Sequence, residues 1–318
     1  MQIVIMDDYQ SVASSLDCYG KLKDHAVTVY HAAAETQDKL VAMLKDADAV
    51  ILLQQRTAMP RTVLERLPRL KLISQTGRNT AHIDIAACKE KGIVVSAGGS
   101  GGANATAELA WALILSSARH IPAEVQAMKE GKWQTTLGTG LAGKTLGVYA
   151  YGRIGSIVAQ VGKAFGMKVV CWGREGSTAK AREAGFDIAA SREAFFAEAD
   201  VLSLHIPLNK ETQGIVKAAD LARMKPSAIL VNTSRAGIVE PNALAEAVHA
   251  GRPGRAAVDV YEVEPVLNGN HALLHTRNVI CTPHLGYVEK DTYETLYNAA
   301  IEQILAFAAG KPINVVNP

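Results

Sequence analysis

Short apolar runs alternate with helical patterns from one end of the chain to the other. The runs lie at residues 2–6, 27–31, 49–53, 72–74, 93–96, 146–149, 168–172, 201–205, 228–232, 256–260 and 279–281. Continuous apolar strands that alternate with helices are typical of parallel sheets covered by helices on both faces. Because the runs fall into two series, we expect an α/β fold of two doubly wound parallel-sheet domains.

A glycine-rich stretch separates the two series. Residues 97–102 read Ala-Gly-Gly-Ser-Gly-Gly, a composition suited to a hinge. A helical pattern over residues 291–309 follows the last strand and could return the chain to the first domain. We therefore expect residues 101–287 to form a domain inserted between residues 1–100 and 288–318, which together form the other. The functional site should then lie in the crevice between the domains, at the carboxyl ends of the strands.

The composition narrows the classes of protein. The chain has 318 residues, enough for two cores, and a formal net charge of +2 without a concentrated basic stretch, so we expect no nucleic-acid partner. The longest apolar run, residues 109–115, is too short to cross a bilayer, and acids follow the first strand where a signal peptide would continue. The four cysteines are isolated in the sequence, which is typical of a reducing compartment. We expect a cytoplasmic protein that does not bind membranes.

Residues 146–155 predict a site for the pyrophosphate of a dinucleotide. An apolar strand enters a tight turn containing Gly152 and Gly155, which opens a helix. Gly152 would let the backbone approach the pyrophosphate, and Gly155 would let the helix pack closely on the strand. The helix has one apolar face, formed by Ile154, Val158, Val161 and Phe165. Ala150 stands where such turns usually begin with glycine, which we expect to require a negative φ at that residue.

The end of the next strand indicates which dinucleotide binds. NAD sites place an Asp or Glu about 20 residues past the glycines, where it binds the ribose 2′-hydroxyl. Here Gly173 and Arg174 follow the strand. The glycine removes a charge that would repel a 2′-phosphate, the arginine can bind that phosphate, and Ser177 could add a hydrogen bond. Glu175 is the competing candidate, since it could still reach a ribose hydroxyl. We expect NADP(H) to be preferred, with NAD(H) as the second choice.

The last three predicted strands are each followed by a residue with acid–base or anion-binding chemistry: Arg235, Glu264 and His284. An arginine can hold the carboxylate of a 2-oxo acid in two hydrogen bonds, and a histidine can exchange the hydroxyl proton near neutral pH. A glutamate can orient that histidine. Each residue also has a structural alternative, as a surface ion pair, a cap or turn residue, or a donor to backbone carbonyls. Their joint placement favours hydride chemistry on a 2-oxo acid.

These motifs resemble, over nearly the whole chain, those of the D-isomer-specific 2-hydroxyacid dehydrogenases, in particular NADP-preferring glyoxylate and hydroxypyruvate reductases. The resemblance is carried by Gly152-Arg153-Ile154-Gly155 and by residues 164–167, 205–208, 232–235, 259–265 and 282–286. It implies a Rossmann nucleotide-binding domain inserted in a flavodoxin-like substrate domain. It also implies that Arg235 binds the substrate carboxylate, that His284 is the general acid/base and that Glu264 tunes His284.

The resemblance further implies a cofactor groove, with Asp259 facing the nicotinamide. The cofactor-binding residues that we expect are Gly152, Arg153, Ile154, Gly155, Arg174, His205, Pro207, Thr212, Thr233, Ser234, Asp259 and Gly286. His205 ends a strand beside this groove, where a backbone-satisfying role is favoured over a catalytic one. Family members are usually dimers joined through the nucleotide domain. The helical pattern at 103–120 is apolar on all sides and suits such an interface, so we expect a homodimer.

One loop departs from the family pattern and bears on the substrate. The usual Gly-x-Gly is Gly77-Arg78-Asn79 here, which places a charge near the expected substrate. Phosphoglycerate dehydrogenases tend to have an arginine for the phosphate at the position of Gln54, although Arg56 stands two residues on. The substrate-binding residues that we expect are Gln54, Gly77, Arg78 and Tyr287, around a small acid such as glyoxylate or hydroxypyruvate.

Three other interpretations stay open. An NAD-dependent D-3-phosphoglycerate dehydrogenase is the alternative among enzymes, and a non-catalytic dinucleotide-sensing module is the alternative outside them. The intact set of arginine, glutamate and histidine argues against a pure sensor. His271 and His275 could hold a metal if they lay on one helix, but residues 268–270 indicate a loop, so we expect no metal site.

Overall fold

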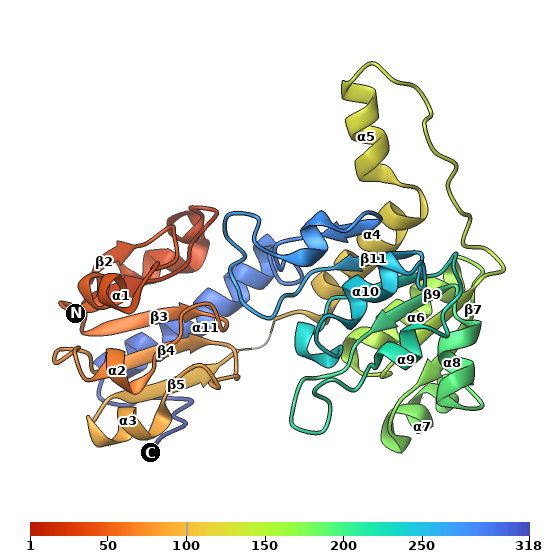
Figure 1. Ribbon diagram of the computed structural model, residues 1–318. Helices are drawn as coiled ribbons and strands as arrows, with labels where there is room; N and C mark the ends of the chain where they lie inside the picture. Colours follow the sequence, from red (N-terminus) through yellow and green to blue (C-terminus); the bar gives the residue numbers. More distant parts are fainter. Residues whose placement is uncertain (100) are drawn as a thin grey trace. The chain divides into compact units, whose positions relative to one another are not determined.

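The computed structural model describes residues 1–99 and 101–318, which divide into two units (Figure 1). Unit 1 consists of Met1–Gly102 with Glu289–Pro318, and unit 2 of Ala103–Val288. The expected boundaries fell after residue 100 and before residue 288. Ser100, within the predicted hinge, lies outside the described residues.

Unit 1 is built on a five-stranded parallel sheet. Its strands are β1 (Gln2–Ile5), β2 (Ala26–Val29), β3 (Ala49–Leu53), β4 (Leu72–Thr76) and β5 (Val94–Gly98). The strand order β2-β1-β3-β4-β5 is that of flavodoxin-like folds, as the resemblance implied. The helices of the unit are η1 (Ala13–Ser15), η2 (Asp17–Leu22), α1 (Gln37–Leu44), α2 (Arg61–Leu64), α3 (Ile85–Glu90) and α11 (Lys290–Ala308).

The last helix and the segment after it are joined to the sheet of unit 1 by buried polar contacts. On α11, the carbonyl of Ala300 accepts a hydrogen bond of 2.7 Å from Ser74 Oγ, and Gln303 Nε2 donates to the same hydroxyl at 2.8 Å. Beyond the helix, Val315 pairs antiparallel with Ser96 of β5. The helical pattern after the second series of strands therefore does return to the first sheet.

Unit 2 holds a seven-stranded parallel sheet. Its strands are β6 (Thr145–Tyr149), β7 (Lys168–Trp172), β8 (Asp187–Ile188), β9 (Val201–Leu204), β10 (Ile229–Asn232), β11 (Arg255–Val258) and β12 (Val279–Cys281). The strand order is β12-β11-β10-β9-β6-β7-β8. Successive strands are added to one side of β6 up to β8 and then, from β9 on, to its other side, as in a Rossmann fold. The two-residue β8 was not predicted, because Asp187–Ile188 forms no apolar run.

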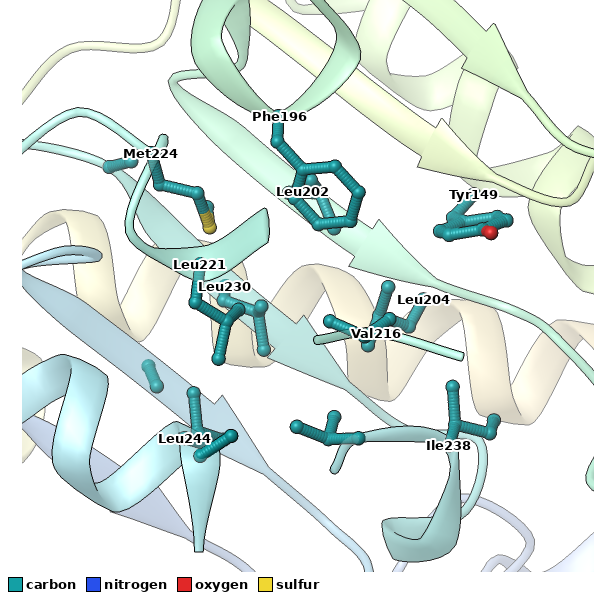
Figure 2. Packing of buried hydrophobic residues seen from close by; sticks show 14 of the residues in the cluster. Tyr149, Phe196, Leu202, Leu204, Val216, Leu221, Met224, Leu230, Ile238 and Leu244 are labelled. Carbon is teal, nitrogen blue, oxygen red and sulfur yellow. The ribbon is translucent and has the colours of Figure 1, made fainter. Parts of the chain in front are cut away.

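Helices cover both faces of this sheet. They are α4 (Ala103–Ala118), α5 (Ile121–Lys129), α6 (Arg153–Ala164), α7 (Glu175–Glu183), α8 (Arg192–Glu198), α9 (Ala218–Leu221), η3 (Ala236–Ile238), α10 (Ala243–His249) and η4 (Ala272–His275). Alternate strand residues enter two cores. Leu202 and Leu204 pack with Phe196 on one face (Figure 2), whereas Val201 packs with Trp111 on the other. The fold class expected from the apolar runs is confirmed.

The carboxyl ends of six strands lie in line. Tyr149 pairs with both Trp172 of β7 and Leu204 of β9. Leu204 in turn pairs with Asn232 of β10, and the same row continues to the last residues of β11 and β12. The residues that follow these strands therefore share one edge of the sheet, and this edge carries the site described below.

Helix α5 and the chain that returns from it project from the rest of unit 2 (Figure 1). This segment exposes Val125, Met128, Trp133 and Leu137, the last at 93% of its surface. Within the described ranges, no helix combines the length and apolarity needed to span a membrane.

Candidate active site

The turn after β6 has the geometry of a phosphate-binding loop. Gly152 is the N-cap of α6, and a Cβ built on it meets no heavy atom within 4 Å. A Cβ on Gly155 would lie 2.3 Å from the carbonyl oxygen of Ala150, so glycine is required there for the helix to approach the turn. The expectation that Ala150 keeps a negative φ is wrong: its φ is 75°, with its N–H donating to the carbonyl of Trp172 at 2.8 Å.

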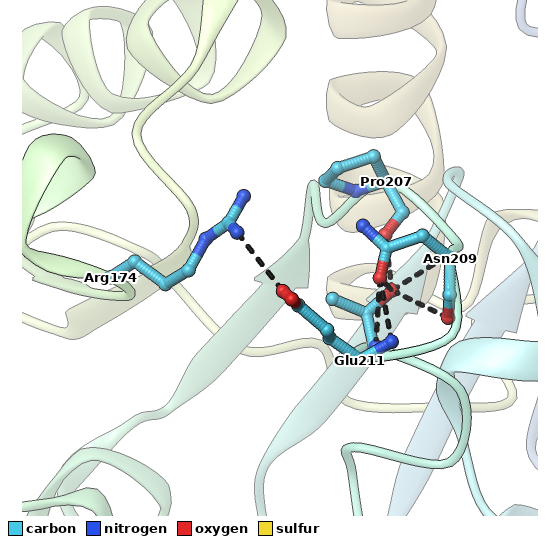
Figure 3. A network of polar contacts seen from close by, with 5 residues as sticks. Arg174, Pro207, Asn209 and Glu211 are labelled. Carbon is cyan, nitrogen blue, oxygen red and sulfur yellow. Dashed lines mark hydrogen bonds and ion pairs between the residues drawn. The ribbon is translucent and has the colours of Figure 1, made fainter.

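The turn after β7 is tied to the turn after β6. Ser177 Oγ accepts a hydrogen bond of 2.7 Å from the backbone N–H of Tyr151. A Cβ on Gly173 would lie 3.1 Å from the same hydroxyl, so a larger residue would crowd this contact. Arg174 is the N-cap of α7, and its Nη1 lies 3.3 Å from a carboxylate oxygen of Glu211 (Figure 3).

The loop after β9 is a closed turn. Thr212 Oγ1 donates to the carbonyl of Pro207 at 2.6 Å, and Asn209 Oδ1 accepts the N–H groups of Glu211 and Thr212 at 2.9 and 3.1 Å (Figure 3). Before this turn, Nε2 of His205 lies 2.9 Å from Ser203 Oγ. Burial lowers the pKa of His205 to about 4, so this ring is neutral at physiological pH.

The loop after β10 positions Arg235. The side chain of Asn232 makes two hydrogen bonds within this loop. Its Oδ1 accepts the N–H of Ser234 at 3.0 Å, and its Nδ2 donates to the carbonyl of Arg235 at 3.0 Å. Ser234 Oγ donates to the carbonyl of Ile206, which joins this loop to the one after β9. Nη1 of Arg235 donates to the carbonyl of Ser234 at 2.7 Å, and the side chain is half-buried.

The loops after β11 and β12 bring Glu264 and His284 together. Glu264 Oε2 lies 2.6 Å from His284 Nδ1, and the two side chains are 18% and 16% exposed. The other carboxylate oxygen accepts the N–H of Tyr261 at 3.0 Å. A carboxylate on Nδ1 fixes the orientation of the imidazole ring. The ring of Tyr287 stacks edge-on against His284, with centroids 5.5 Å apart.

Asp259 holds the loop that carries His284. The residue is fully buried, and its carboxylate accepts hydrogen bonds from Thr282 Oγ1 at 2.6 Å and from the N–H groups of Leu285 and Gly286 at 2.7 and 2.9 Å. Burial raises the pKa of Asp259, and the three donors oppose that rise. Both oxygens of Asp259 thus bind protein donors, which gives the residue a positioning role; its expected contact with the nicotinamide stays a prediction.

In unit 1 the predicted substrate residues Gln54 and Gly77 lie together. A Cβ on Gly77, whose φ is 102°, would lie 3.5 Å from the side-chain amide of Gln54. The backbone N–H of Gln54 donates to Thr76 Oγ1 at 2.9 Å, which links the loops after β3 and β4. Arg78 is exposed at the start of the next loop. Tyr287, the fourth residue of the predicted set, belongs to unit 2.

Comparisons with known proteins agree with these motifs. Residues 111–286 match the family model of the D-isomer specific 2-hydroxyacid dehydrogenase NAD-binding domain. The chain is 38% identical to a glyoxylate reductase of Aeropyrum pernix over 88% of its length and 86% of the relative's. The chain belongs to the D-isomer-specific 2-hydroxyacid dehydrogenase family.

Other members of the family carry different substrate names. A hydroxypyruvate reductase of Blautia hydrogenotrophica is 31% identical over the full length of both chains. A crystal structure of a phosphoglycerate oxidoreductase from Vibrio cholerae is 46% identical, covers 98% of this chain and 99% of its own, and superposes with a TM-score of 0.94. Relatives that are named for different substrates therefore share this family and fold.

A nicotinamide dinucleotide, the cofactor class of the family, fits the edge of the sheet. Gly152 leaves open space at the N-terminus of α6, where free N–H groups favour a phosphate. Thr233 Oγ1, after β10, is buried and has no hydrogen-bond partner among the described residues, as expected of a hydroxyl that meets a ligand. The residues that would hold the cofactor thus lie along the strand ends from β7 to β12.

One residue beside this site, Glu211, was not among the predicted site residues. Glu211, opposite Arg174, gave no signal of its own, although the residues 209–212 (Asn-Lys-Glu-Thr) are typical of a turn. His271 and His275 do not meet: His271 pairs with Glu262 at 2.9 Å, and His275 Nε2 lies 2.9 Å from the carbonyl of Gly269. In the part of the chain that the structure describes, no three His, Cys, Asp or Glu side chains are grouped to hold a metal ion.

Proposed function

We propose that this protein reduces a small 2-oxo acid to a D-2-hydroxy acid with NADPH. The observation that carries the proposal is the pair of His284 and Glu264, 2.6 Å apart at the strand ends that also position Arg235. Paired acid–base residues of this kind are typical of proton transfer, and a pure sensor would not need them.

The three residues have complementary roles in this proposal. The bound dinucleotide supplies the hydride. His284 donates a proton from Nε2 to the carbonyl oxygen, and Glu264 stabilises the charged imidazole that is present before the transfer. Arg235 binds the carboxylate of the acid and polarises the carbonyl. Asp259 keeps the histidine loop in place through its three hydrogen bonds.

The preference for NADPH rests on the turn after β7. Gly173 stands where NAD sites carry an acid, and Arg174 is next to it with its side chain 76% exposed. Ser177 accepts a hydrogen bond from the neighbouring turn, so its own O–H is free to donate to a phosphate. Glu175 Oε1 lies 4.0 Å from Nη1 of Arg182, about two turns along α7.

Glyoxylate or hydroxypyruvate is the substrate class that we favour. Gln54 occupies the position of the phosphate-binding arginine, and the relatives named glyoxylate reductase and hydroxypyruvate reductase match at least 86% of their own length. A phosphoglycerate dehydrogenase activity, with NAD, is the second candidate, favoured by the 46% identity to the Vibrio cholerae phosphoglycerate oxidoreductase.

We further propose a cytoplasmic homodimer. The four cysteines, at 18, 88, 171 and 281, are free thiols, which suits a reducing compartment. The projecting segment around α5 exposes Met128, Trp133 and Leu137, a set of large apolar side chains that a second copy of the chain would cover. Sedimentation of the purified protein tests the dimer.

Steady-state kinetics with a panel of 2-oxo acids tests the function. We expect NADPH oxidation with glyoxylate or hydroxypyruvate, and a lower kcat/KM with NADH. A preference for 3-phosphohydroxypyruvate with NADH would favour the second candidate. Tight NADPH binding without turnover of any acid in the panel would favour a dinucleotide-sensing module instead.

A further inference from the structure

The ion pair of Arg174 and Glu211 spans the turn that follows β6. Arg174 follows β7, and Glu211 lies on the loop after β9; these two strands flank β6 on either side. The two charged groups are 3.3 Å apart (Figure 3). Adjacent strands lie about 4.8 Å apart, so the pair bridges two strand spacings, directly beside the glycine turn where the pyrophosphate would bind.

The backbone of Glu211 is fixed by the turn around it. Asn209 Oδ1 accepts the N–H of Glu211 at 2.9 Å, and Thr212, which is buried, donates to the carbonyl of Pro207 at 2.6 Å (Figure 3). The turn therefore keeps the backbone of Glu211 within side-chain reach of Arg174. Among the described residues, Arg174 forms an ion pair with this carboxylate.

We infer that Glu211 is a specificity-determining residue, because it competes with the 2′-phosphate of the cofactor for Arg174. This inference rests on the proposed use of NADPH. Arg174 can bind the carboxylate or the phosphate, and the phosphate carries the larger negative charge. A 2′-phosphate that takes the donor now facing Glu211 displaces this carboxylate, whereas an uncharged ribose 2′-hydroxyl competes with it only weakly. Glu211 thus weakens the preference for NADP(H) and helps the site accept both cofactors.

Both side chains are about three-quarters exposed, which limits the size of the effect. Exposed ion pairs change an equilibrium by up to about fivefold, and salt screens them. We expect Glu211→Gln to shift binding by about threefold at low salt. The shift should be lost near 1 M salt, where the screening length falls to about 3 Å.

Calorimetric titration of the full chain with 2′,5′-ADP and with ADP tests the inference. Glu211→Gln should bind 2′,5′-ADP about threefold more tightly and ADP as the unsubstituted protein does. Glu198→Gln is the matched control. Glu198 is exposed at the end of α8, next to the amino end of β9, so this substitution removes the same charge at the opposite edge of the sheet. Equal binding of 2′,5′-ADP by Glu211→Gln and the unsubstituted protein would overturn the inference.

A double variant separates competition for Arg174 from simple repulsion of the phosphate. In an Arg174→Ala background, Glu211→Gln should no longer change the affinity for 2′,5′-ADP, because there is no shared partner. An undiminished gain in that background would contradict the competition. If the unsubstituted protein binds ADP as tightly as 2′,5′-ADP, the proposed NADPH preference fails; if it prefers 2′,5′-ADP and Glu211→Gln changes nothing, only the role of Glu211 fails.

Discussion

The two ends of the same sheet edge in unit 2 are built differently. At the β11 and β12 end, Glu264, His284 and Asp259 are buried or nearly so. The carboxylates of Glu264 and Asp259 each have at least two polar partners. At the β7 end, Arg174 and Glu211 are three-quarters exposed and share a single contact. The first end is determined by many mutually dependent contacts, and the second by one.

This difference fits the proposed division of labour. Proton transfer needs a histidine held in one orientation, so its carboxylate partner and its loop are fixed by buried contacts. Discrimination between a 2′-phosphate and a 2′-hydroxyl needs only a difference of a few kcal/mol at most, which an exposed cation can supply. Substitutions at the first end should therefore affect turnover, and those at the second end should affect only the choice of cofactor.

Removing the histidine is the strongest test of the first end. His284→Ala removes the proton donor, so we expect kcat to fall by about a thousandfold, with NADPH binding retained. Steady-state kinetics and NADPH fluorescence titration measure the two effects. His249→Ala, an exposed histidine at the end of α10, is the control and should leave kcat unchanged. A kcat within tenfold of the unsubstituted value would contradict the role of His284.

Asp259→Asn tests whether the histidine loop is held by a carboxylate. The amide has one acceptor oxygen, and its NH2 would face the N–H of Leu285 or Gly286, so a donor is left unpaired. We expect the free energy of unfolding to fall by about 2 kcal/mol. We also expect kcat to fall by at least about tenfold, because a displaced loop misaligns His284 with the substrate.

Asp200→Asn provides the matched control for this substitution. Asp200 also accepts hydrogen bonds on both of its carboxylate oxygens, one from Lys225 and one from the N–H of Thr145, but at the amino ends of β6 and β9. It should lower stability without lowering kcat. If both variants lost stability and neither lost kcat, Asp259 would be a structural residue only.

Local, repeated patterns in the sequence predicted the structure well. Among the residues that the structure describes, the apolar runs predicted eleven of the twelve strands, and the strand order explains why residues far apart in the chain meet at one edge. Glu264 and His284 were grouped because each follows a predicted strand. Their contact depends on the exact path of two loops, including a φ of 53° at His284, which no local pattern indicates.

The misses have the same origin. Ala150 adopts a φ of 75° because the turn is fixed by hydrogen bonds to β7 and to Gly152, which override the preference of alanine. Glu211 stands 37 residues from Arg174 on a polar loop, and only the order β9-β6-β7 brings them together. Tertiary pairings of this kind need the strand order first and the loop geometry second.

Arg174→Ala tests the second end. If Arg174 binds the 2′-phosphate, we expect the KM for NADPH to rise about tenfold and the KM for NADH to stay unchanged, because a charge-assisted contact is lost with one cofactor only. Arg182→Ala, on the same helix and also exposed, is the control and should affect neither. An equal rise with both cofactors would contradict a role in discriminating between them.

The smallest expected effect comes from His205, which follows β9 in the middle of the edge. Its pKa is lowered to about 4 in the folded chain by burial, against about 6.5 in the unfolded chain. As the pH falls from 6.5 towards 4, the unfolded chain binds a proton that the folded chain does not, so stability is lost in this window. His205→Gln should therefore lose less stability than the unsubstituted protein between pH 7 and pH 5, by on the order of 1 kcal/mol. Urea midpoints at the two pH values measure the difference. Because the ring is neutral above pH 5, the substitution should leave the pH dependence of kcat/KM above pH 5 unchanged; an altered profile would mean that His205 also takes part in proton transfer.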